Sequence, residues 1–185
     1  MKTNFPAIAA YKLRFEQSQI NELSARYCEQ NSDQTNESYI ENVIAPTTKA
    51  AGFYTREDFL KVCHWKTPRS QPHCQRNDEA VVREATSVAL SANCEQLRIG
   101  VLTILHGVSF PTASVLLHFA HADRYPILDF RALESLSIPL PNDYDVDFWN
   151  EYVQICRRIA DQAEVKMRTL DRALWQFSLE NPVSD

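Results

Sequence analysis

The stretch that decides the fold is residues 105–114, LHGVSFPTAS, near the middle of the 185-residue chain. Apolar residues precede Gly107 at helical spacing, and a second apolar helical segment follows it. Glycine tolerates a positive φ, so a helix can end there in a tight turn. Pro111 falls in the first turn of the next helix, where a missing N–H removes no hydrogen bond. The stretch therefore predicts two helices joined by a short hairpin.

This hairpin also predicts a phosphate-binding site. The N–H groups of the turn and of the next helix's first turn would converge on one point, and together with the helix dipole they favour an anion. A DNA phosphate would bind there without any readout of base sequence. The alternative interpretation is a plain helical corner capped by glycine, because such caps are common.

A second informative stretch is residues 125–133, YPILDFRAL. Asp129 follows three apolar residues and opens a new helix, a position from which a carboxylate can project into a cleft. The alternative is that Asp129 only caps the N-terminus of that helix, as aspartate commonly does.

The two stretches together resemble the helix-hairpin-helix superfamily of DNA glycosylases, which includes the endonuclease-III-like and alkyladenine-excising enzymes. The family hairpin reads roughly Leu-Pro-Gly-Val-Gly-x-Lys-Thr-Ala. It is matched here by Leu105, Gly107, Val108, Thr112 and Ala113. The family's second segment, roughly Pro-Val-Asp-Thr-His-Val-x-Arg, is similar to residues 126–131, with Asp129 in the place of the essential aspartate.

The resemblance implies an all-α, two-lobed helical bundle formed by residues 1–185 as a single unit, with the hairpin and catalytic segment at 97–136. It implies a glycosylase that flips a damaged or modified base out of double-stranded DNA and hydrolyses its glycosidic bond. Asp129 would stabilise the positive charge that develops on the sugar and orient a water. The residues that the resemblance implies in DNA contact are His106, Gly107, Val108, Ser109, Thr112 and Arg131.

Departures from the family pattern narrow the predicted chemistry. Pro111 stands where bifunctional members carry the lysine that forms a Schiff base, so the resemblance implies a monofunctional enzyme. Ser109 replaces the second glycine of the hairpin. No cysteine follows Cys156, so the iron–sulfur loop of some relatives is absent and no cofactor is expected. The biological setting is either base-excision repair or defence against foreign DNA with hypermodified bases.

Residues 64–77, HWKTPRSQPHCQRN, predict the pocket for the flipped base. Trp65 could stack on the base, while Lys66 and Arg69 could hold phosphate or base oxygens. The alternative is that Trp65 belongs to the core and the two cations are solvated. Adjacent Cys-His pairs at 63–64 and 73–74 suggest zinc, but they lack a Cys-x-x-Cys clip, so no metal is expected.

The rest of the chain also reads as helical, because it has only three glycines and no Asn-Gly or Asp-Gly hairpin signal. Thr55, with Asp58 three residues later, predicts a capped helix start, and Asn77 predicts another. A long loop is expected over 66–76. Helices are expected at 14–30, 39–44 (stopped by Pro46), 55–65, 77–92, 94–106, 112–121, 130–136, 146–160 and 170–179.

Composition sets the remaining expectations. The net charge of −5 is not that of a protein held to DNA by bulk charge. Of the three thirds of the chain, only residues 61–131 carry more basic than acidic side chains. Five scattered cysteines and the lack of a long apolar run predict a cytoplasmic protein without disulfides or membrane contact, and we expect it to be a monomer. Two rival functions stay open: a non-catalytic helix-hairpin-helix DNA-binding module, and a helical partner protein that never meets DNA.

Overall fold

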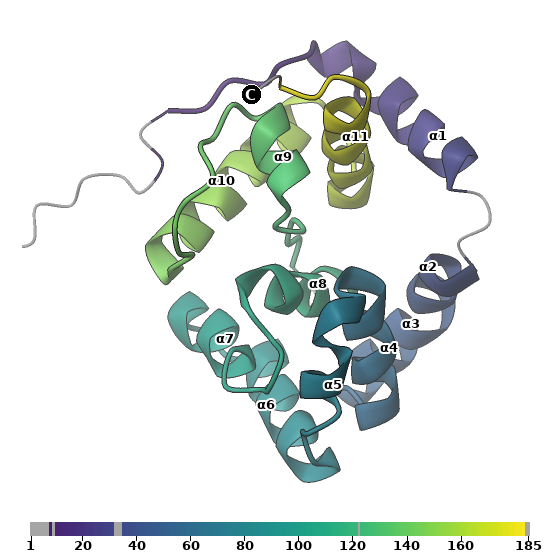
Figure 1. Cartoon of the computed structure of the whole chain (residues 1–185), viewed down its shortest axis with the longest axis vertical. Helices are drawn as coiled ribbons and strands as arrows, with labels where there is room; N and C mark the ends of the chain where they lie inside the picture. The colour runs from purple at the N-terminus through teal and green to yellow at the C-terminus, as the bar shows by residue number, and fades with distance from the viewer. Residues whose placement is uncertain (1–7, 9, 32–34, 122, 184–185) are drawn as a thin grey trace, which may run out of the picture. The chain divides into compact units, whose positions relative to one another are not determined.

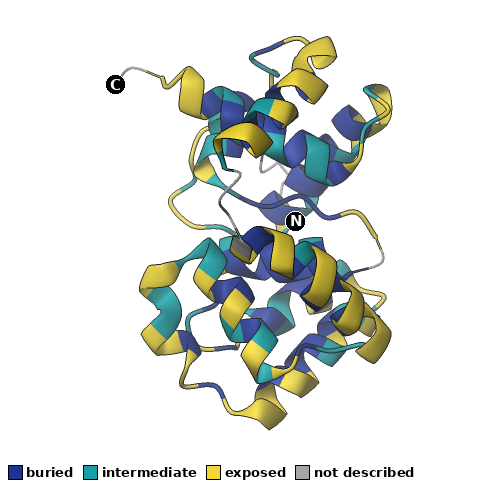
Figure 2. Cartoon of the chain, turned by 90° about the vertical axis from the view of Figure 1, so that its right-hand side faces the viewer, coloured by how far each residue is buried: buried dark blue, intermediate teal, exposed yellow. Residues whose placement is uncertain are grey.

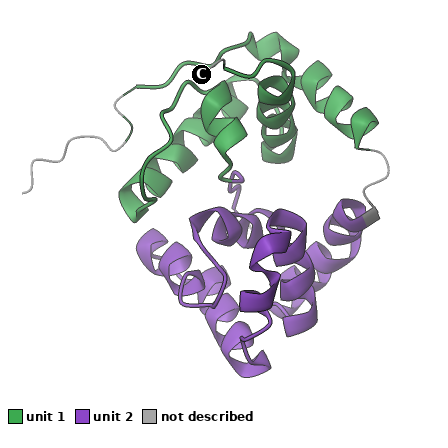
Figure 3. Cartoon of the chain, in the orientation of Figure 1, with its two compact units in different colours: residues 1–32, 128–185 green, residues 33–127 purple. Residues whose placement is uncertain are grey.

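The computed structural model describes residues 8, 10–31, 35–121 and 123–183, and this part of the chain is all α-helical, with no β-strand (Figure 1). The chain divides into two compact units (Figure 3). Unit 1 comprises residues 1–32 and 128–185, and unit 2 comprises residues 33–127. The boundary falls between Ile127 and Leu128, inside the predicted segment 97–136.

Unit 2 is built around one buried helix, α8, which spans Phe110–Ala120 and packs against α3, α4, α6 and α7. Eight of its residues are buried, because apolar and small side chains occupy nearly every face. The hydroxyl of Tyr54 donates to the carbonyl oxygen of Leu116 at 2.9 Å. The elements before α8 are α2 (Thr35–Tyr39), η2 (Ile40–Ile44), α3 (Ala45–Ala51), α4 (Arg56–Lys66), η3 (Pro68–Ser70), α5 (Gln71–Cys74), α6 (Glu79–Ser91) and α7 (Glu95–Leu102).

Unit 1 is organised by α11 (Met167–Glu180), which packs against α1 (Ile20–Gln30), α9 (Phe130–Ser135) and α10 (Val146–Gln162). Its interior holds large side chains with no exposed surface, Trp149 and Tyr152 among them. In each unit the buried residues, dark blue in Figure 2, fill the interior. Burial of this apolar surface is the main stabilising term of such helical units.

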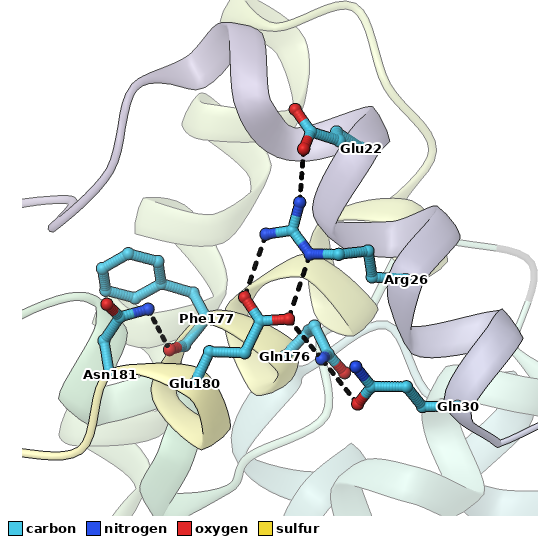
Figure 4. A network of polar contacts seen from close by, with 7 residues as sticks. All are labelled: Glu22, Arg26, Gln30, Gln176, Phe177, Glu180 and Asn181. Carbon is cyan, nitrogen blue, oxygen red and sulfur yellow. Dashed lines mark hydrogen bonds and ion pairs between the residues drawn. The ribbon is translucent and has the colours of Figure 1, made fainter.

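Polar contacts join α1 to α11 (Figure 4). The guanidinium of Arg26 donates through two nitrogens to the carboxylate of Glu180, at 3.0 and 2.9 Å. The side-chain amide of Gln176 donates to Gln30 Oε1 at 2.9 Å. Arg26 and Glu180 thus form a bidentate pair, with two N–H···O bonds that fix the relative orientation of the guanidinium and the carboxylate.

Several predicted helix boundaries are confirmed. Thr55 caps α4, and its Oγ1 accepts the N–H of Asp58 at 3.2 Å. Pro111 lies in the first turn of α8. The helices expected over 77–92, 130–136 and 146–160 are present as α6 (Glu79–Ser91), α9 (Phe130–Ser135) and α10 (Val146–Gln162). These boundaries depend on local capping and periodicity, which the sequence carries directly.

The prediction of one helix over 14–30 is wrong at its start. A 3-10 turn, η1, covers Gln17–Gln19, and α1 begins at Ile20. The N–H groups of Lys12 and Arg14 donate to the carbonyls of Leu136 and Ser135 at 2.8 and 2.9 Å. Backbone pairing with the end of α9 therefore keeps this segment extended.

The prediction that Pro46 ends a helix is also wrong, because the helical run continues from α2 through η2 into α3. Segment η2 is a π-helix, in which the N–H of Ala45 donates to the carbonyl of Ile40. A π turn is wider than an α turn, so it relieves the clash between a proline ring and the preceding turn.

The expected loop over 66–76 contains η3 and α5, and each of these short helices has a proline in its first turn. The expected helix over 94–106 ends at Leu102, and residues 103–107 form turns. Asn77 does not cap α6, whose N-cap is Asp78. The early end of α7 and the change of N-cap share one tertiary cause, because the side chain of Asn77 binds the hairpin backbone, as described below.

No helix in the described ranges is long and apolar enough to cross a bilayer.

Thiol labelling tests this burial pattern. Cys28 and Cys94 are exposed, whereas Cys63, Cys74 and Cys156 are buried. Burial also raises the pKa of the Cys63 and Cys156 thiols, which suppresses the reactive thiolate. We expect a neutral maleimide to modify two cysteines in the native protein and all five in urea, as counted by mass spectrometry. Rapid native labelling of Cys156 would contradict the packing of unit 1.

Candidate functional site

The predicted hairpin is present, and Gly107 is its pivot. Gly107 has a φ of 78°, in the left-handed region that favours glycine. A Cβ at this position would lie 2.7 Å from Cys74 Sγ, 2.9 Å from the Cys74 backbone nitrogen and 3.0 Å from His73 Cβ. The turn therefore needs glycine twice, once for its φ and once for its close approach to α5.

Asn77 clamps the hairpin from the neighbouring corner. Its side-chain Oδ1 accepts the N–H of His106 at 2.8 Å, and its Nδ2 donates to the carbonyl of His106 at 2.9 Å. The same Nδ2 donates to the carbonyl of Cys74 at 2.9 Å. Arg56 holds this corner in turn, because its guanidinium donates to the carbonyls of Asn77 and Gln75 at 2.7 and 2.6 Å. One buried amide thus satisfies both backbone groups of His106 and fixes the turn.

The N-terminus of α8 follows immediately after the turn. Ser109 is the N-cap residue and makes no side-chain capping bond. The first N–H bonded within the helical pattern is that of Ala113, which donates to the carbonyl of Ser109 at 2.8 Å. The N–H groups of Phe110 and Thr112 precede that bond, and Pro111 has none. This is the arrangement in which a helix N-terminus accepts an anion.

The predicted DNA contacts at the hairpin differ in exposure. His106 and Ser109 are exposed and Gly107 is partly exposed. Val108 and Thr112 are buried, with 7% and 2% of their surface exposed. The N–H of Val108 already donates to the carbonyl of Leu105 at 3.1 Å, so of these two residues only Thr112 has a backbone N–H for an anion. Burial thus divides the predicted contact residues into exposed and packed side chains, and their contact with DNA stays a prediction.

The sequence on either side of the hairpin turn is poor in acidic residues. Residues 96–121 and residues 59–77 contain no aspartate or glutamate. The second range contributes exposed His73 and Arg76 from the α5 side of the turn. Arg76 is a cation close to the turn, but exposed Asp78 and Glu79 follow Asn77 directly, so the surface beside the hairpin carries both signs of charge.

Asp129 lies in unit 1 as the N-cap of α9. Its Oδ1 accepts the N–H of Arg131 at 3.0 Å, so the capping role that the sequence left open is a feature of the structure. Its carboxylate charge acts on neighbours: burial and then the charge of Asp129 raise the pKa of Tyr144. The side chain is partly exposed, so a capping bond and contact with solvent coexist.

Arg131, two residues further on, is held by aromatic rings. Its guanidinium carbon lies 5.3 Å from the ring centre of Trp175 and 5.1 Å from that of Phe130. Stacking of this kind orients a guanidinium while leaving its edge available for an anion. Ser135, at the other end of α9, donates to the carbonyl of Leu174 at 2.6 Å and fixes α9 against α11.

The predicted base-pocket residues separate in the structure. Trp65 lines a cavity of about 340 Å³ in unit 2, and it also packs edge-on against Phe119 with ring centres 5.6 Å apart. Trp65 therefore packs on the core and also borders a cavity, and its stacking on a base stays a prediction. Lys66 and Arg69 do not line this cavity. Tyr39 lines the cavity from α2 and was not predicted, because no local pattern links it to Trp65, 26 positions later in the sequence.

The two Cys-His pairs do not form a metal centre. Cys63 and Cys74 meet as buried thiols, and a hydrogen bond from Cys63 lowers the pKa of Cys74. His64 lines the cavity, and His73 is exposed. Over the ranges that the structure describes, no group of three or more His, Cys, Asp or Glu side chains could hold a metal ion.

Comparison with protein families, with curated proteins and with solved structures found no match to this chain. The fold and site define an all-α protein with a glycine-pivoted hairpin before a buried helix and a helix-capping carboxylate 18 residues after Pro111.

Proposed function

We propose that this protein is a monofunctional DNA glycosylase, active as a cytoplasmic monomer on double-stranded DNA. The observation that carries the proposal is the Gly107 turn. Asn77 holds its backbone in place, and the N–H groups of Phe110 and Thr112 precede the first helical hydrogen bond of α8. Such a turn binds a phosphate by backbone alone, which suits an enzyme that must track DNA of any sequence.

In this proposal Asp129 carries the chemistry. The glycosidic bond between the sugar and the flipped base breaks, and its electron pair leaves with the base nitrogen. Water adds to the anomeric carbon and gives a proton to the Asp129 carboxylate, and that proton passes through solvent to the departing base. The products are an abasic site, a neutral free base and an ionised Asp129. The carboxylate stabilises the positive charge on the sugar as the bond breaks. Arg131 lies two residues away and would contact a phosphate.

A second candidate is a non-catalytic DNA-binding module that keeps the hairpin only. The observation in its favour is the capping bond from the N–H of Arg131 to Asp129, because that bond explains an aspartate at this position without any reaction. The two candidates make different products from the same experiment, since a binding module leaves every base in place.

The test of the proposal is product analysis on a panel of duplexes carrying oxidised, alkylated, deaminated and hypermodified bases. A glycosylase releases a free base from at least one of them, as detected by mass spectrometry. Identification of that base also separates a role in repair from one in defence against foreign DNA. Binding to the whole panel without release would favour the non-catalytic module, and the absence of both would overturn the two candidates together.

The abasic product should remain an intact strand. Pro111 has no side-chain amine and stands where a lyase would place its lysine. We therefore expect no covalent adduct when borohydride is added to enzyme and substrate DNA, and strand breaks only after alkali treatment. A bifunctional glycosylase run in parallel provides the positive control. A trapped adduct would show that another lysine attacks the sugar, and the monofunctional assignment would be wrong.

A further inference from the structure

The cavity in unit 2 has the composition of a binding site for a flat ring. Its walls come from α2, η2, α4 and α5. Three aromatic side chains line it, Tyr39, His64 and Trp65, together with the apolar Leu60 and Ile40. Its volume of about 340 Å³ lies at the small end of ligand pockets, which suits one ring system rather than an extended ligand.

One residue that lines the cavity has a buried acceptor without a hydrogen-bond partner. Gln71 lines the cavity, and its side-chain Oε1 is buried without a hydrogen-bond partner. A buried acceptor left unpaired is destabilising. A ligand with an N–H on its edge would satisfy it.

The rim is electrically neutral. Lys61 and Glu57 both line the cavity, and they form an ion pair with an N–O distance of 2.8 Å. The ammonium of Lys61 also lies 4.9 Å from the ring centre of Tyr39. A neutral rim favours an uncharged ring over a free phosphate or a carboxylate, since no cation at the rim is left for an anion to pair with.

We propose that this cavity binds a nucleobase whose edge carries an N–H donor, with Gln71 as the residue that reads the donor. The ring would stack against Tyr39 and Trp65, and the N–H would pair with Gln71 Oε1. The idea that the base arrives within a DNA strand rests on the proposed function. Binding of the base itself does not, and a free nucleoside presents the same chemistry.

The experiment measures binding of free nucleosides to the full-length protein by calorimetry. Adenosine carries an exocyclic amino group, and purine riboside has hydrogen in its place. We expect adenosine or another amino-bearing nucleoside to bind at least about tenfold more tightly than its counterpart without the donor. The Gln71→Leu variant should bind both members of the pair equally. A preference that survives in Gln71→Leu would overturn the assignment of Gln71.

Tyr39 tests the stacking without disturbing the core, because 43% of its surface is exposed. Tyr39→Ala should weaken nucleoside binding about tenfold or more, as the loss of one stacking partner does. Val43→Ala is the matched control, since Val43 is 42% exposed in the following turn of the same helical run and does not line the cavity. Equal binding by these two variants would count against the site.

A second arm identifies the source of the base. Single-stranded and duplex oligonucleotides carrying the preferred base at one position are compared with the free nucleoside. Tighter binding of the oligonucleotide that is lost in Tyr39→Ala and Gln71→Leu assigns the site to DNA, whereas equal or weaker binding assigns it to a free nucleoside. If no nucleoside and no oligonucleotide depends on these residues, the inference is wrong.

The failure of this inference can be told apart from the failure of the proposed function. Nucleoside binding with no base release from any duplex would support the cavity site and reject the glycosylase. Base release that is unchanged in Tyr39→Ala and Gln71→Leu would support the glycosylase and reject the cavity as its base pocket.

Discussion

Replacing Gly107 by alanine is expected to lower the free energy of unfolding by about 2 to 5 kcal/mol, because two separate penalties add. The left-handed φ of 78° is unfavourable for any residue with a Cβ. The new methyl would also overlap Cys74, whose Sγ and backbone nitrogen lie 2.7 and 2.9 Å from its position. The backbone nitrogen cannot rotate away as a side chain can, so α5 or the hairpin must shift.

The other two glycines of the chain separate these penalties. Gly52 has a φ of 76° but no atom within 4 Å of a Cβ, so Gly52→Ala should cost only the backbone term of about 1–2 kcal/mol. Gly100 is helical and also open, so Gly100→Ala should be neutral or stabilise by up to about 1 kcal/mol. Urea unfolding of the three variants checks the order. A Gly107→Ala variant no less stable than Gly52→Ala would show that the hairpin does not pack against α5.

The same position tests phosphate binding. Under conditions where the variant is still folded, Gly107→Val should weaken binding to all duplexes by a similar factor, because the contact carries no sequence information. Salt titrations of wild type and variant measure the lost phosphate contact as a shallower dependence of log K on log salt. A variant that loses affinity for one sequence alone would contradict a backbone contact.

Asp129→Asn is expected to reduce base release by at least about a hundredfold while the protein stays folded. Asparagine caps a helix about as well as aspartate, so the bond from the N–H of Arg131 can be kept and the stability should change little. The negative charge that would stabilise the sugar is lost. Binding to DNA should be unchanged or slightly tighter, because a carboxylate no longer repels phosphate.

Asp145→Asn is the matched control for Asp129→Asn. Asp145 is also an N-cap in unit 1, and its Oδ1 accepts the N–H of Phe148 at 2.8 Å. Asp145→Asn should keep full base release. Asparagine preserves the capping bond in both variants, and only Asp129 has a proposed part in the reaction. Wild-type turnover by purified Asp129→Asn would remove Asp129 from the catalytic role and leave it only the capping role.

Local signals in the sequence were sufficient for much of the helical framework. The cap at Thr55, the proline at the start of α8 and the positive φ of Gly107 were all predictable, because each depends on the chemistry of one residue and its near neighbours. Pro46 shows the limit of this reasoning. A proline usually ends a helix, but a π turn before it lets the helix continue.

The sequence by itself determined the all-α class, the hairpin turn and the position of Asp129 at a helix start. Only the tertiary structure decided what Asn77 does. Asn77 and Asp78 are both good caps, but the side chain of Asn77 binds the backbone of His106, so Asp78 is the N-cap of α6. Only the tertiary structure brought Tyr39, Trp65 and Gln71 around one cavity. Capping and periodicity act over a few residues, whereas a cavity depends on how separate helices pack, which no local pattern encodes.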